Sequence, residues 1–140
     1  MRQVSELMIR SVATILERQT VAEAREEMEL SHIRHLPVVD AEGRLVGVVS
    51  DRDLMRAGDP TDSVGACMSA AVATVSPETD LTEAAFLLIR DRIGCLPVSD
   101  ASGKLLGILT ESDFVRLAHD LLGGADLEER LREDEQSKEA

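Results

Sequence analysis

The segment Leu36-Pro37-Val38-Val39-Asp40 decides the fold of this chain, because it occurs a second time as Leu96-Pro97-Val98-Ser99-Asp100. Sliding the sequence against itself by 60 positions aligns the two copies and extends the match, without a gap, to Val4–Ala57 and Val64–Leu117. A match of this length at one fixed offset is the signature of an internal repeat. The chain is therefore built from two copies of one structural unit.

Each repeat carries the same order of secondary-structure signals. The first helix of each repeat is marked by a cap, Thr20-Val21-Ala22-Glu23 in the first copy and Asp80-Leu81-Thr82-Glu83 in the second. Asp40–Gly43 and Asp100–Gly103 have the residues of a tight turn between two strands. The predicted elements, given for the first and then the second repeat, are a strand (Val12–Leu16; Val72–Val75), a helix ending near Ser31 or Asp91, a strand pair (Leu36–Val39 with Leu45–Ser50; Leu96–Ser99 with Leu105–Thr110) and a helix (Asp51–Ala57; Glu111–Leu122).

The order β-α-β-β-α describes a unit too small to bury both faces of its sheet. We therefore predict an α/β (α+β) fold in which two tandem repeats pack as one pseudo-two-fold body. The expected boundaries are residues 1–60, 61–122 and an acidic tail at 123–140. The segment Ala57–Asp62 has linker composition, Gly123-Gly124 ends the last helix, and the tail is expected to form a solvated helix.

Composition limits the function classes. The 140 residues are 44% hydrophobic and carry a formal net charge of -12, a field that repels phosphate backbones, so nucleic-acid binding is not expected. No apolar run reaches the length of a membrane span, and no signal peptide is evident, so a cytoplasmic protein without membrane contact is expected. Two Phe and no Trp or Tyr leave only aliphatic side chains to sandwich a base.

The repeated pattern resembles the CBS domain family. The similarity rests on Leu36–Asp40 with Gly43–Leu54, and on Leu96–Asp100 with Gly103–Phe114. The resemblance implies two clefts between the repeats, and ligands that contain adenosine: AMP, ADP, ATP, S-adenosylmethionine or NAD. It also implies a regulatory sensor rather than an enzyme, with no required cofactor, a homodimer, and a regulated protein partner that the sequence does not identify.

The sharpest ligand-binding candidates are Ser50 with Asp53, and Thr110 with Asp113. A carboxylate can accept hydrogen bonds from both ribose hydroxyls, and the resemblance assigns this role to the aspartates. The same S/T-x-x-D spacing at the start of a helix is also an ordinary capping motif, and both roles can coexist. The full set of predicted ligand-binding residues is Ser50, Asp53, Arg52, His35, Pro37, Ala13, Thr14, Thr110, Asp113, Ala73, Thr74 and Pro97.

The two repeats differ in charge around these candidates. The first supplies Arg34, His35 and Arg52, where the second has Gly94, Cys95 and Ser112. Phosphate affinity is therefore expected to be greater at the Asp53 site. Arg10 and Arg92 could add charge, but the sequence does not place them.

A second asymmetry concerns partners. Ala84–Ile89 is apolar all round its helix, whereas its counterpart Ala24–Glu29 has a charged face. A helix of this kind either packs in a dimer interface or is buried more deeply within one chain, and the sequence favours neither. The competing function is a ligand-free interaction or assembly module, in which Asp53 and Asp113 serve only as caps. No catalytic motif or set of metal ligands is recognised.

Overall fold

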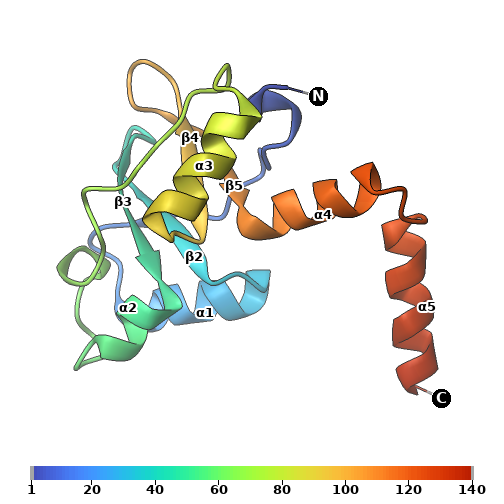
Figure 1. The fold of residues 1–140 in the computed structure, drawn as a ribbon. Helices are drawn as coiled ribbons and strands as arrows, with labels where there is room; N and C mark the ends of the chain where they lie inside the picture. The colour runs from blue at the N-terminus through green and yellow to red at the C-terminus, as the bar shows by residue number, and fades with distance from the viewer. Residues whose placement is uncertain (1, 140) are drawn as a thin grey trace. The chain divides into compact units, whose positions relative to one another are not determined.

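The computed structural model describes residues 2–139 and confirms the mixed α/β class with two repeats (Figure 1). By contacts it forms two compact units that divide between Leu109 and Thr110. The elements of the first repeat are η1 (Val4–Glu6), β1 (Ile15–Leu16), α1 (Val21–Ser31), β2 (His35–Val39), β3 (Leu45–Ser50) and α2 (Asp51–Arg56). Those of the second are η2 (Val64–Ala66), α3 (Leu81–Asp91), β4 (Cys95–Ser99), β5 (Leu105–Thr110) and α4 (Glu111–Leu121), and the tail forms α5 (Leu127–Glu139).

The first repeat forms a three-stranded sheet of order β1-β2-β3, and the second a two-stranded sheet of β4 and β5. β2 and β3 are antiparallel, while β1 pairs in parallel with β2 through Ile15↔Val38 and Leu16↔Val39. The second repeat has only the isolated parallel bridge Val75↔Val98 at this place.

The predicted first strands, Val12–Leu16 and Val72–Val75, were therefore too long. Ala13 packs against the buried core of the first repeat, while Val12 and Val72 pack against a second buried cluster. These apolar side chains pack in tertiary contacts, while their backbone does not pair in a sheet. Strand propensity does not distinguish these two situations.

The predicted helix starts and turns are confirmed. Thr20 and Glu23 form the capping box of α1, and the carboxylate of Asp80 accepts from the amide of Thr82 at the start of α3. Each hairpin turns at a glycine with positive φ, +82° at Gly43 and +86° at Gly103. Local sequence signals alone therefore determine where these elements begin.

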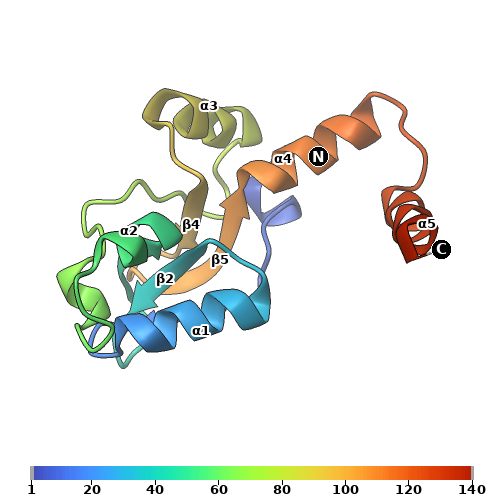
Figure 2. The ribbon, with the colours of Figure 1, turned by 90° about the horizontal axis from the view of Figure 1, so that it is seen from below.

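α1 buries one face against the sheet of its own repeat. Val21, Ala24 and Met28 join Leu36 and Val49 in a single buried cluster, and Figure 2 shows α1 running beneath β2. Each fully buried aliphatic side chain contributes about 1.5–3 kcal/mol to folding, so this face anchors the helix.

The two repeats exchange equivalent backbone hydrogen bonds. The amide of Leu45 donates to the carbonyl of Gly103 (2.9 Å), and the amide of Leu105 donates to the carbonyl of Gly43 (3.1 Å). Since each partner in one bond lies 60 positions from its counterpart in the other, the repeats are related by an internal two-fold relation. The bridges Val48↔Ser69 and Ile9↔Ile108 obey the same relation.

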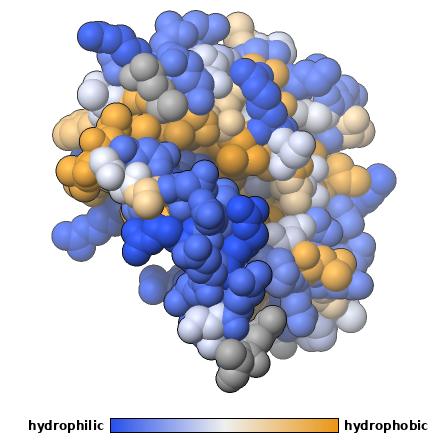
Figure 3. All heavy atoms as spheres, turned by 90° about the vertical axis from the view of Figure 1, so that its right-hand side faces the viewer, coloured by the Kyte–Doolittle hydropathy of each residue, from blue (hydrophilic) through white to orange (hydrophobic). Residues whose placement is uncertain are grey.

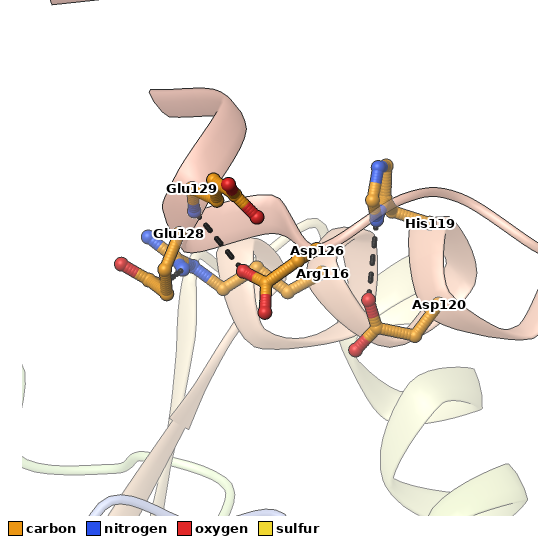
Figure 4. Close-up of polar contacts among 6 residues, drawn as sticks. All are labelled: Arg116, His119, Asp120, Asp126, Glu128 and Glu129. Atoms are coloured by element: carbon orange, nitrogen blue, oxygen red, sulfur yellow. Dashed lines mark hydrogen bonds and ion pairs between the residues drawn. The ribbon is translucent and has the colours of Figure 1, made fainter. Parts of the chain in front are cut away.

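The unit that begins at Thr110 consists of α4, a glycine turn and α5. Gly123 has φ +82° just after α4 ends, and Arg116 of α4 pairs with Glu128 of α5 at 2.8 Å (Figure 4). α5 confirms the predicted helical tail. Its surface is hydrophilic almost throughout (Figure 3).

Candidate functional site

A cleft of about 840 Å³ opens between the two repeats, within the range typical of ligand sites. It contains five of the predicted ligand-binding residues: His35, Ser50, Arg52, Asp53 and Ala73. The remaining lining residues are Arg34, Val48, Asp51 and Met55 from the first repeat, and Ser69, Ala71, Val72, Asp91, Arg92, Ile93, Gly94 and Cys95 from the second.

Ser50 and Asp53 are held by a reciprocal capping box where β3 meets α2. The amide of Ser50 donates to Asp53 Oδ2 (2.9 Å), and the amide of Asp53 donates to Ser50 Oγ (3.1 Å). The cap uses one carboxylate oxygen and an acceptor position of the hydroxyl. Asp53 Oδ1 and the hydroxyl proton of Ser50 remain available to a ligand, so capping and binding are compatible here.

Three guanidinium groups line the cleft, those of Arg34, Arg52 and Arg92. Arg34 precedes β2 and Arg52 lies in the first turn of α2, both in the first repeat. Arg92 is the C-cap that follows α3, and it has a left-handed backbone with φ 52°. The cleft thus has positive groups from both repeats, in a chain that is strongly acidic.

One of the nearby carboxylates is already neutralised. Arg90 holds Asp91 through two hydrogen bonds, Nε to Oδ1 (2.8 Å) and Nη2 to Oδ2 (3.1 Å), which lower the pKa of the Asp91 carboxyl. Two carboxylates, Asp51 and Asp53, therefore remain to balance the three guanidinium groups.

The floor of the cleft joins His35 to the second repeat. A Cβ on Gly94 would lie 2.6 Å from Cε1 of the His35 ring, so the ring occupies the space that any side chain at 94 would need. The neighbouring Cys95 is buried, and burial raises the pKa of its thiol to about 11. This thiol is therefore protonated at neutral pH.

The other predicted residues of this unit lie outside the cleft. Pro37 and Pro97 are fully buried within β2 and β4. Ala13 packs on the core and Thr14 is exposed. Thr74 lines a separate cavity of about 680 Å³ on the second repeat.

Thr110 and Asp113 form the corresponding motif where β5 meets α4. The amide of Thr110 donates to Asp113 Oδ2 (2.8 Å), and its hydroxyl also donates to that oxygen (3.1 Å). The hydroxyl proton of Thr110 is thus bonded within the motif, whereas that of Ser50 remains available to a ligand. This difference agrees with the expectation that the two sites are not equivalent.

Sequence reasoning missed the second-repeat contribution to the Asp53 cleft, above all Arg92 and Ala71–Val72. No local motif places these residues, because they reach the cleft through the packing of one repeat on the other. Among residues 2–139, no group of three or more His, Cys, Asp or Glu side chains is placed to hold a metal ion. No helix in this range is long and apolar enough to cross a membrane.

Comparisons with known proteins agree with this architecture. The model of the CBS domain family matches residues 4–59 and 64–120, and the chain therefore belongs to that family as a tandem pair of CBS domains. It is 34% identical to inosine-5'-monophosphate dehydrogenase of Methanocaldococcus jannaschii over 82% of this chain, a match that spans only 23% of that enzyme.

Two solved structures are similar over most of the chain. CBSX2 of Arabidopsis thaliana, in complex with AMP, is 33% identical with a TM-score of 0.79, covering 85% of this chain and 97% of that one. The cytosolic domain of the Mg²⁺ channel MgtE, in complex with ATP, is 34% identical with a TM-score of 0.76, covering 83% of this chain and 48% of that one.

Proposed function

We propose that this chain is a regulatory sensor that binds an adenosine-containing ligand in the Asp53 cleft. The observation that carries the proposal is the capping box of Ser50 and Asp53, which lines a cleft of nucleotide size together with Ala71–Ala73 of the other repeat. Asp53 accepts hydrogen bonds from the ribose hydroxyls through its free oxygen, and the Ser50 hydroxyl donates a hydrogen bond to the ribose or to the first phosphate. Val48, Val72 and Ile93 supply the aliphatic contacts that the adenine needs in a chain poor in aromatic residues.

Two relatives support the choice of ligand. CBSX2 was crystallised with AMP and the MgtE domain with ATP, and both contain the fold described above. In this chain, a ligand that contacts both walls of the cleft changes the packing of one repeat on the other. That change is the signal that a regulated partner protein reads.

The proposal is tested by calorimetric titration of nucleotide-free protein with AMP, ADP, ATP, S-adenosylmethionine and NAD. One or more of these should bind, and Asp53→Ala should abolish most of the affinity. A ligand at a hundredfold its dissociation constant should also stabilise the fold by about 2.7 kcal/mol.

Asp80→Ala is the matched control, because Asp80 caps α3 but lies outside the cleft. Both variants should lose about 1 kcal/mol of stability through the weakened cap, and only Asp53→Ala should lose binding. Undiminished binding in Asp53→Ala would show that the cleft is wrongly assigned. The absence of binding by every compound would leave the chain as an interaction module.

One observation favours that second function. Phe86 and Ile89 on α3 remain 51% and 76% exposed, so the apolar face anticipated from the sequence is not buried within the described chain. We infer that this face forms a homodimer, the arrangement in which a sensor of this kind would act in the cytoplasm. The same face would serve an assembly module that binds no nucleotide.

A further inference from the structure

We propose that the Asp53 cleft selects adenosine ligands with two or more phosphates over the monophosphate. The inference rests on the proposed function and concerns the phosphate end of the same ligand. It is carried by the guanidinium groups of Arg34 and Arg52 on the first repeat and of Arg92 on the second. Arg92 is the decisive residue, because it is the one that the second repeat contributes.

The guanidinium groups of Arg34, Arg52 and Arg92 are uncommitted. Among residues 2–139, no ion pair or side-chain hydrogen bond joins Arg34, Arg52 or Arg92 to another group. Arginine forms paired hydrogen bonds with phosphate oxygens readily, and guanidinium groups without carboxylate partners are ready to accept an anion.

The local balance of charge in the cleft also favours an anion. Asp91 is neutralised by Arg90, and Asp53 is committed to the ribose and to the amide of Ser50. Asp51 Oδ1 accepts from the amide of Arg52 at 2.9 Å, and Asp51 also lines the cleft. With Asp91 paired, three arginines face two carboxylates, Asp51 and Asp53, in a chain whose net charge is -12. Such a local reversal of sign favours a ligand with several negative charges.

The arginines of the cleft come from both repeats, Arg34 and Arg52 from the first and Arg92 from the second. A single phosphate attached to a ribose at Asp53 lies beside the first repeat, which supplies Arg34 and Arg52. Each further phosphate lengthens the anion and adds charge that can reach Arg92 of the second repeat, the C-cap of α3. The interaction with Arg92 is thus made by a diphosphate or triphosphate and not by the monophosphate.

The same charges weigh against S-adenosylmethionine. Its sulfonium and amino groups are positive, and binding them would bring like charges close to three guanidinium groups, which is unfavourable. The cleft of about 840 Å³ has room for the longer nucleotides. Charge, rather than space, is therefore what separates the candidate ligands here.

The experiment is calorimetric titration of the nucleotide-free full chain with adenosine, AMP, ADP, ATP and sodium tripolyphosphate. ADP or ATP should bind at least about tenfold more tightly than AMP, the size expected for one added charge-assisted pair. In Arg92→Gln the preference should fall to near one, while the affinity for AMP stays within about twofold.

Two further variants keep the test decisive. Arg92→Asn should behave like Arg92→Gln, and it retains a residue that tolerates the left-handed backbone at φ 52°, so loss of folding does not confuse the result. Arg18→Gln removes the same charge from an exposed position outside the cleft, and it should preserve the preference.

The outcomes separate this inference from the proposed function. If AMP and ATP bind equally and Asp53→Ala abolishes both, the sensor stands and the selectivity for polyphosphate is overturned. Equal weakening of AMP and ATP by Arg92→Gln, or by Arg18→Gln, would also overturn it, since the effect would then be general electrostatic attraction. If tripolyphosphate binds but no adenosine compound does, the proposed function fails, and selectivity among nucleotides fails with it.

Discussion

The imidazole ring of His35 lies directly over Gly94, so a residue of the first repeat occupies the place of a side chain in the second. The two positions line the same cleft. Their counterparts in the repeat are Cys95 and Arg34, which do not reproduce the contact, because the thiol is smaller and the arginine side chain fills its own position. The two repeats therefore differ in structure at this contact.

The first prediction follows from this contact. Gly94→Ala should displace the His35 ring, because the new Cβ would stand 2.6 Å from Cε1 and 2.9 Å from Nε2. We expect a loss of about 1 kcal/mol in the free energy of unfolding, at the low end for overpacking because a side chain can move where backbone cannot. We also expect weaker ligand binding, since the displaced ring enters the cleft. Chemical denaturation and titration measure the two effects.

Gly58→Ala is the control for this variant. Gly58 has no other heavy atom within 4 Å of an added Cβ and lies in the exposed linker. It should change neither stability nor binding appreciably. Unaltered affinity in Gly94→Ala would show that the position of the His35 ring does not matter to the ligand.

A second prediction concerns the glycines where the repeats meet. An added Cβ at Gly47 would lie 2.6 Å from the carbonyl oxygen of Ser69, and one at Gly107 would lie 2.8 Å from that of Ile9. Because these neighbours are backbone atoms held by the inter-repeat bridges, they cannot move aside cheaply. Gly47→Ala and Gly107→Ala should each cost about 1–3 kcal/mol, more than Gly94→Ala, in equilibrium unfolding.

The pairing of these two variants is itself a test of the internal two-fold relation. If only one of them destabilised the chain, the two inter-repeat bridges would not be equivalent. A normal melting temperature for both would contradict the close approach of the repeats.

Much of the fold could be predicted from the sequence because it depends on local signals. The caps at Thr20 and Asp80 and the turns at Gly43 and Gly103 each involve residues within a few positions of one another. The length of β1 could not be predicted, because Val12 and Ala13 have the composition of a strand while their side chains pack on buried clusters instead.

The candidate site, too, could be predicted only where it depends on a local motif. Ser50 and Asp53 were identified from a motif of four residues, and the structure places both in the cleft. Arg92 and Ala71 could not be placed, because they reach the cleft through the packing of one repeat on the other. That packing depends on the shape of the completed repeats and leaves no spacing in the sequence.

A third prediction tests the exposed face of α3. Ile89→Glu introduces the acidic residue that the first repeat carries at the equivalent position, Glu29, and it should convert a homodimer to a monomer. The reason is that a buried charge without a partner disfavours an apolar interface. Light scattering coupled to size-exclusion chromatography measures the change in mass.

The control for this variant is Leu30→Glu, since Leu30 is 70% exposed on the equivalent helix α1. It should leave the mass unchanged. A wild-type chain that elutes as a monomer, or an Ile89→Glu variant that remains a dimer, would rule out α3 as the homodimer interface.

The last prediction concerns the two thiols and pH. Burial raises the pKa of Cys95 to about 11, and burial together with the charges of Asp53 and Asp62 raises the pKa of Cys67. At pH 8 the Cys95 thiol, with a pKa of about 11, is ionised in only about one molecule in a thousand, so iodoacetamide should modify Cys67 before Cys95. Mass spectrometry of the labelled peptides gives the order directly.

The same shift makes stability depend on alkaline pH. In the unfolded chain the Cys95 thiol ionises near its ordinary pKa of about 8.5, whereas in the folded chain it stays protonated until about 11. The unfolded state therefore releases protons first, and stability should decline as the pH rises through this window and be unaffected by this group below it. Cys95→Ala should flatten the decline more than Cys67→Ala. An equal slope in wild type and Cys95→Ala would show that the Cys95 thiol does not account for the alkaline loss.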